Sequence, residues 1–271
     1  MPVNRRGASL VELIVALALA ALVAGSVARV FLLQTRSYRE LVQRAGLADN
    51  LRAGADILAA DLWSLDATDG DILALGPDSL RIRGERRFGV VCAVTPGAGV
   101  VTVTLRDTLT FGVRDFRPGD SLLAYVPGDS EWVAGAVAST TSPAQCPDSA
   151  AGERLAATFP APGPVPGVPI RGYEIVTYRS YRAADGSYYL GLRDAGGLQP
   201  LAGPLTADGL RLSYFDAAGA ETATATQVQA VRIALRVVSA EPVVRRGRTA
   251  VLVDSVALWL ALRNNRRPGP P

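Results

Sequence analysis

The sequence predicts an α+β protein in which one long N-terminal helix packs on an antiparallel β domain. Three observations support this prediction. An apolar stretch near the N-terminus passes directly into an amphipathic stretch of helical period, and no proline occurs between Val3 and Gly76. From Leu80 onward the apolar period changes to two, with turn residues at short intervals.

The first half of the predicted helix, residues 8–30, has the composition of a membrane span. No charge occurs between Leu13 and Ala28. The 21 residues from Ala8 to Ala28 are enough to cross the hydrocarbon core of a bilayer as a helix. Arg5 and Arg6 precede this stretch, so we expect a short cytoplasmic segment before it and a non-cytoplasmic domain after it.

The second half, residues 31–67, continues the helix with a different surface. Apolar residues recur at spacings of three and four, which predicts one buried stripe that packs on the core: Leu41, Ala45, Ala48, Leu51, Ala55, Leu58, Leu62 and Leu65. We therefore predict a single helix from about Ser9 to Leu65, on the order of 85 Å long. Gly25 and Gly46 are the positions where a bend is expected.

Residues 68–265 are predicted to form the antiparallel β domain. The expected strands are 88–94, 100–106, 121–126, 132–139, 173–181, 187–193, 210–215, 227–238 and 249–262. Asp185 and Gly186 predict a hairpin turn, and residues 245–248 predict another. The proline-rich segment 159–169 favours an extended linker. We expect it to divide the β region into parts 80–157 and 170–262, forming two packed sheets. Residues 266–271 are expected to be a disordered tail.

Glu12 is the one acid in the apolar stretch, and placing it in hydrocarbon costs about 2.5–3.5 kcal/mol. We therefore expect it to have a partner. Together with Arg5, Arg6 and Gly7, it forms a pattern that resembles the processing site of type IV prepilins and type II secretion pseudopilins. The resemblance implies cleavage between Gly7 and Ala8 by a prepilin peptidase, with 1–7 as the leader. It also implies N-methylation of Ala8, although the family usually has phenylalanine there.

Further segments resemble the W-type minor pilins and J-type pseudopilins. They are 51–62 in the helix and 175–179, 210–219, 228–235 and 256–265 in the β region. The resemblance implies a non-enzymatic subunit with a single inner-membrane span, a cytoplasmic N-terminus and a periplasmic domain. Its implied partners are other minor pilins or pseudopilins, the major subunit, the peptidase and membrane lipid. Glu12 would then pair with the new amine of Ala8, from its own chain or from a neighbouring subunit.

Two other interpretations of the N-terminus were weighed. An ordinary signal peptide would be cleaved after Ser26-Val27-Ala28 and would release a β-rich module that binds carbohydrate or DNA. A twin-arginine signal would use Arg5 and Arg6, but a glycine follows the pair in place of the expected residues. An acid near the start of the apolar stretch argues against an ordinary signal peptide.

Composition disfavours most enzymes. The chain has no histidine, which excludes serine–histidine and cysteine–histidine nucleophiles and imidazole metal ligands. No phosphate-binding glycine loop is present, so we expect no cofactor and no small-molecule substrate. The net charge of +3 gives little reason to expect nucleic-acid binding. Two arginine clusters are explained equally well by strand-edge protection: Arg81, Arg83, Arg86 and Arg87, and Arg245, Arg246 and Arg248.

Two further groups of residues are candidate sites. Cys92 and Cys146 are the only two cysteines; they form one disulfide if the domain is exported, or are two separate buried thiols. Asp66, Asp69 and Asp71 crowd the segment after the helix, and oxygen ligands suit calcium. Their spacing does not follow the EF-hand pattern, so a solvated turn that ends the helix is favoured and no metal is expected.

Overall fold

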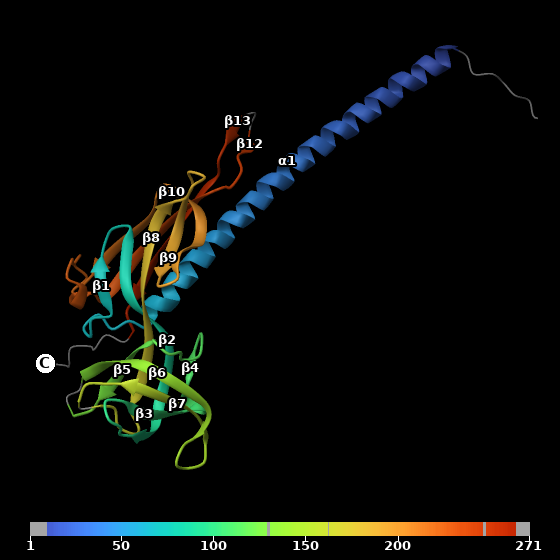
Figure 1. Ribbon diagram of the computed structural model, residues 1–271. Helices are drawn as coiled ribbons and strands as arrows, with labels where there is room; N and C mark the ends of the chain where they lie inside the picture. The colour runs from blue at the N-terminus through green and yellow to red at the C-terminus, as the bar shows by residue number, and fades with distance from the viewer. Residues whose placement is uncertain (1–9, 129–130, 162, 246–247, 264–271) are drawn as a thin grey trace, which may run out of the picture. The chain divides into compact units, whose positions relative to one another are not determined.

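A computed structural model describes residues 10–128, 131–161, 163–245 and 248–263 (Figure 1). It confirms the predicted α+β class, with one helix followed by antiparallel strands. The chain divides into two compact units, which are described separately. The first comprises Met1–Asp49 with Val238–Asp254, and the second comprises Asn50–Val237 with the segment from Ser255.

Helix α1, Leu10–Trp63, contains 54 residues and continues through Gly25 and Gly46 without interruption. It runs through both units. Within the first unit, strands β12 (Val243–Arg245) and β13 (Arg248–Ala250) pair with each other as a small second sheet. The segment that leads into β12 contacts the helix, because the backbone amide of Glu241 donates to Oε1 of Gln43 at 3.4 Å.

The remaining strands form one hydrogen-bonded, antiparallel system. Their bounds are β1 Ile72–Leu75, β2 Ser79–Thr95, β3 Val101–Arg106, β4 Phe111–Gly112, β5 Ser121–Val126, β6 Glu131–Gln145, β7 Ala151–Thr158, β8 Pro169–Arg182, β9 Tyr188–Asp194, β10 Gly197–Phe215, β11 Ala230–Val238 and β14 Val253–Ala261. Two short 3₁₀ turns, η1 (Asp107–Leu109) and η2 (Ala225–Gln227), interrupt this run of strands.

Six of these strands close into a barrel. The order of pairing is β2, β3, β7, β6, β5 and β8, and β8 pairs again with β2. The closing contacts place Ile170 opposite Gly89, and Gly172 opposite Leu122. The barrel has a continuous apolar core that consists of Val91, Val103, Leu105, Phe116, Leu122, Ala124, Val137, Leu155, Ala157, Val168 and Ile170. In Figure 1 the colour of these strands runs from blue-green at the start of β2 to yellow in β8.

An open sheet covers the end of the helix. The first half of β2 and the second half of β8 extend beyond the barrel and pair there, with β1 on one side and β9, β10, β11 and β14 following on the other. Leu58 and Leu62 of the helix are fully buried. A Cβ atom added at Gly54 would lie 3.1 Å from Ala202 and from Leu235. The predicted stripe is therefore core packing in this part of the helix, where each buried leucine contributes about 1.5–3 kcal/mol.

The β domain thus has two parts, but they are not separated as expected. Strands β2 and β8 belong to both the barrel and the open sheet. The proline-rich segment before Pro169 forms no strand in its described residues and only connects β7 to β8. Strand β2 begins well before the expected 88–94 because Leu80 and Ile82 are buried in alternation with exposed or half-buried arginines. Because several arginines stand close together in this segment, its alternation of apolar and polar residues was not recognised as a strand.

The close approach at Gly54 generates the first prediction. Gly54→Leu is expected to destabilise the chain by about 1–3 kcal/mol, since its side chain would collide with three packed side chains of the sheet. Gly46→Leu is the matched control, because no atom lies within 4 Å of a Cβ at that helical position. Chemical denaturation of the detergent-solubilised full chain measures both. Equal stability of Gly54→Leu and the wild type would contradict the packing described.

Candidate functional site: the exposed helical surface and its anchor

The N-terminal half of α1 exposes a continuous apolar surface. Each large apolar side chain from Leu10 to Leu33 is more than half exposed within the chain. In the described residues, α1 is long and apolar enough to cross a membrane, with a mean hydropathy of 2.5 in its most apolar window. An uncovered surface of this kind is not stable in water. By length and composition, this part of α1 is a candidate membrane span.

Glu12 lies in the first turn of α1. A carboxylate at this end of a helix is favoured by the partial positive charge of the unpaired amides. Gly7 and Ala8 lie outside the described residues. Cleavage between them, methylation of Ala8 and an ion pair between its amine and Glu12 therefore stay predictions.

A chain of ion pairs anchors the other end of the helix. Asp61, in the last turns of α1, accepts from Arg86 of β2 at 3.0 Å and from the hydroxyl of Tyr178 at 2.6 Å. Arg86 also contacts Glu174 of β8 at 3.2 Å. Burial, followed by the charge of Asp61, raises the pKa of Tyr178. Tyr178 therefore keeps its proton and remains a donor to the helix.

The same chain continues into the segment between β4 and β5. Arg114 contacts Glu174 and Asp120 at 2.6 Å each. Burial alone would raise the pKa of Asp120, but its hydrogen bonds from Arg114 and from the amide of Arg117 lower it overall. These successive ion pairs thus connect α1, strands β2 and β8, and the segment between β4 and β5.

A second, deeper ion pair holds the segment that follows the helix. Asp71 is fully buried and accepts from Nη2 of Arg171 at 2.9 Å. Nε of Arg171 donates to Glu85 at 2.9 Å. Asp71 also accepts from the backbone amide of Asp66 at 2.9 Å. The strand β8 therefore provides the charge that balances an acid one hundred residues earlier in the chain.

The aspartates after the helix differ from the solvated turn that was favoured. Asp66 and Asp71 are buried, whereas Asp69 is partly exposed. Oδ1 of Asp66 accepts from the amides of Thr68 and Asp69. Burial, followed by the charge of Asp69, raises the pKa of Asp66. Asp71 uses Arg171 as its counter-charge, and the described residues contain no cluster of three or more acidic, cysteine or histidine side chains suited to a metal.

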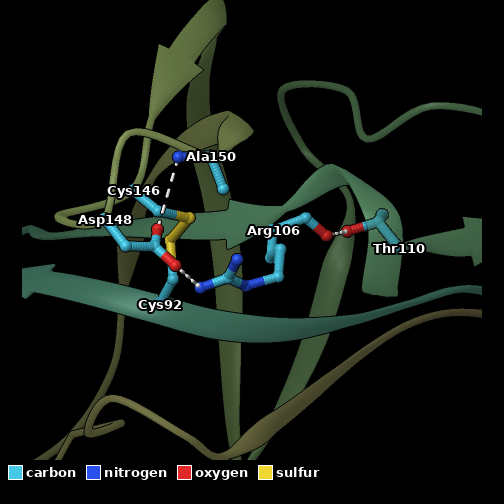
Figure 2. Close-up of a disulfide and its surroundings, with 6 residues drawn as sticks. All are labelled: Cys92, Arg106, Thr110, Cys146, Asp148 and Ala150. Atoms are coloured by element: carbon cyan, nitrogen blue, oxygen red, sulfur yellow. Dashed lines mark hydrogen bonds and ion pairs between the residues drawn. A yellow bond between two sulfur atoms is a disulfide. The ribbon is translucent and has the colours of Figure 1, made fainter.

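Cys92 of β2 and Cys146, which follows β6, form a disulfide (Figure 2). Next to it, Arg106 contacts Asp148 at 2.6 Å, and the amide of Ala150 donates to the same carboxylate at 3.3 Å. The hydrogen bond from Arg106 lowers the pKa of Asp148. The bond links a strand of the barrel to the turn between β6 and β7. It therefore fastens one end of the barrel.

The arginines predicted as a cluster on β2 do not form a continuous, solvent-exposed basic patch. Arg86 and Arg87 are engaged in ion pairs, Arg87 with Asp115 at 2.6 Å and with Glu153 at 3.1 Å. Arg83 donates to the carbonyl of Asp69 at 3.3 Å and lies over the ring of Tyr173. The second cluster lies partly outside the described residues. The described contacts thus assign Arg86 and Arg87 to holding the fold.

The sequence did not identify Arg171, Arg86 and Tyr178 as anchoring residues. One signal in the sequence is that Arg171 stands between Ile170 and Gly172 in strand β8. Because a buried strand position rarely holds an arginine without a counter-charge, such a residue predicts a buried ion pair. The identity of its partners depends on the pairing of β2 with β8, which no local pattern specifies.

No family model matches the chain, and no curated protein or solved structure is significantly similar to it. The layout itself, a long apolar N-terminal helix followed by an antiparallel β domain, fits that of pilin-like proteins.

The disulfide generates a second prediction. Replacing Cys92 and Cys146 together by serine is expected to cost about 4 kcal/mol, because the bond closes a loop of 54 residues in the unfolded chain. Denaturation of the full chain measures the loss. Dithiothreitol should lower the stability of the wild type by a similar amount and leave the double variant unchanged. A wild type that is insensitive to the reductant and as stable as the variant would contradict the stabilising role.

The raised pKa of Asp66 generates a third prediction. A carboxyl whose pKa is raised by folding stabilises the fold below its unfolded pKa, and this contribution is lost as pH rises through the folded pKa. Asp66→Asn keeps an acceptor for the two amides and should therefore raise the melting temperature at pH 7 more than at pH 4. Asp78→Asn, at an exposed position, should show no such difference. A larger increase in melting temperature at pH 4 than at pH 7 would contradict the prediction.

Proposed function

We propose that the chain is a minor pilin or pseudopilin, a non-enzymatic subunit of a type IV pilus or of a type II secretion pseudopilus. The observation that carries the proposal is the division of α1 into two halves within one uninterrupted helix. Between Leu10 and Ala28 the helix exposes apolar side chains, with Glu12 as its one charged residue, whereas from Asn50 onward the helix packs on the β domain. The resemblance of residues 5–12 to a prepilin processing site supports it.

The proposed location follows from the same division. The N-terminus lies in the cytoplasm, α1 crosses the inner membrane once, and the β domain lies in the periplasm. The disulfide between Cys92 and Cys146 supports an oxidising compartment for that domain. Prepilin peptidase removes residues 1–7, and the new N-terminus at Ala8 becomes methylated.

The proposed action is mechanical. The subunit leaves the lipid and joins other minor subunits and the major subunit in the tip or initiation complex, and its exposed helical surface exchanges lipid for neighbouring helices. Glu12 pairs with the amine of an Ala8, because two opposite charges cost far less to bury together than singly. The energy comes from a separate cytoplasmic ATPase. The ion pairs around Asp61 and Arg171 keep the β domain attached to the helix while the helix is moved.

Assembly in cells tests this proposal. Glu12→Val should be processed normally, but its amount in sheared filaments should fall about tenfold or more, because the buried amine loses its counter-charge. Gly7→Leu should retain the leader, visible as a larger mass in the membrane fraction.

Glu40→Gln, in the same helix but beyond the apolar stretch, is the matched control and should assemble like the wild type. Normal filament incorporation of Glu12→Val would overturn the role of the acid. Normal removal of residues 1–7 from Gly7→Leu would overturn the processing site.

A further inference from the structure

A cavity of about 460 Å³ lies beside the barrel, in the second unit. Its lining comes from the segment after the helix and from strands β2, β5, β6 and β8, namely Asp66, Asp69, Glu85, Phe88, Tyr125, Trp132, Pro169 and Arg171. Its volume falls within the range of small-molecule binding pockets, about 300–1,000 Å³. The proposed assembly role uses the ion pairs of one lining residue, Arg171, but gives the cavity itself no function.

One wall of the cavity is aromatic. Tyr125 and Trp132 are directly opposite each other on β5 and β6, and their rings meet edge to face with centroids 5.6 Å apart. Phe88 of β2 belongs to the same lining. Such a wall offers a broad apolar surface for the flat face of a ring-shaped ligand.

The polar part of the lining has hydrogen-bonding capacity that the described residues do not use. The side chain of Arg171 is 7% exposed. Its Nε and Nη2 donate to Glu85, Asp71 and the carbonyl of Ser64, but its Nη1 has no hydrogen-bond partner among the described residues. The carboxylate of Asp69 likewise accepts no hydrogen bond from any described group, since only the backbone of Asp69 is engaged. Nη1 is not one of the buried polar atoms that lack a partner in the described residues, so a ligand in the cavity would take the place of solvent at this donor.

The charges select the kind of ligand. A cationic ligand would meet Arg171, which already lies over the ring of Trp132 at 5.3 Å. An anionic ligand would meet Asp66, Asp69 and Glu85. A neutral group that both donates and accepts hydrogen bonds meets no repulsion, because hydroxyls can accept from Arg171 and donate to the carboxylates.

From this geometry we propose that the cavity binds one neutral pyranose residue of a glycan. The C–H face of the sugar ring packs on Trp132 and Tyr125, while its hydroxyls accept from Nη1 of Arg171 and donate to the carboxylate of Asp69. The site gives the β domain a ligand-binding capacity in addition to the proposed structural role in a filament. It does not depend on that role, since no residue of the helix before Asp66 takes part.

Saturation-transfer difference NMR on the detergent-solubilised full chain tests the proposal. The probes are maltotriose, cellotriose, mannotriose and chitotriose, and the competing probes are N-acetyl-arginine amide and glucuronate. At least one of the neutral trisaccharides should bind. Trp132→Ala should weaken that binding about tenfold or more, because it removes the aromatic wall.

Asp69→Asn is the second variant. Its side chain makes no hydrogen bond in the described structure, and removing its charge relieves the repulsion on Asp66. It should therefore weaken sugar binding severalfold without lowering the melting temperature. Trp259→Ala, at an exposed tryptophan of β14, should bind like the wild type. The proposal is wrong if none of the trisaccharides binds, if both cavity variants bind as well as the wild type, or if only a charged probe binds.

Discussion

The structure depends on one constraint, which is that a single uninterrupted helix has two different surroundings. From Asn50 onward, the helix is covered by its own β domain, and Leu58 and Leu62 are fully buried. From Leu10 to Leu33, every large apolar side chain is more than half exposed within the chain. The helix from Asn50 onward is thus stabilised by its packing in the fold, whereas the apolar first half has the length and composition of a membrane span.

The buried ion pairs hold the end of the helix and the segment that follows it against strands β2 and β8. Hydrophobic contacts do not specify one register, whereas the ion pair of Asp61 with Arg86 joins the helix to β2, and that of Asp71 with Arg171 joins the segment after the helix to β8. Removing one partner of such a pair leaves a buried charge uncompensated, which costs several kcal/mol. The barrel and the open sheet share β2 and β8, so both anchors act on the same two strands.

The sequence predicted the length of the helix well because its signals are local: an unbroken helical period and no proline. The predicted buried stripe is confirmed only from Leu51 onward, because Leu41, Ala45 and Ala48 are exposed within the chain. It also predicted strands wherever apolar and polar residues alternate clearly. It failed for the first half of β2, where arginines at positions 81, 83, 86 and 87 carry long side chains that lie partly buried in ion pairs. The barrel, the partner of Arg171 and the cavity beside Trp132 depend on pairings between distant strands, which local patterns do not encode. Asp66 and Asp71 were expected in solvent because their burial also depends on strands that are distant in the sequence.

The measurement that tests the central claim most directly is the mass of the mature N-terminus, obtained by intact mass spectrometry of the chain extracted from membranes. If the exposed helical half is an anchor and an assembly surface, the chain begins at Ala8 and retains Glu12 with the full apolar stretch. A mass corresponding to a start at Arg29 would show that this half is discarded as a signal peptide, and the account of the helix given above would be wrong.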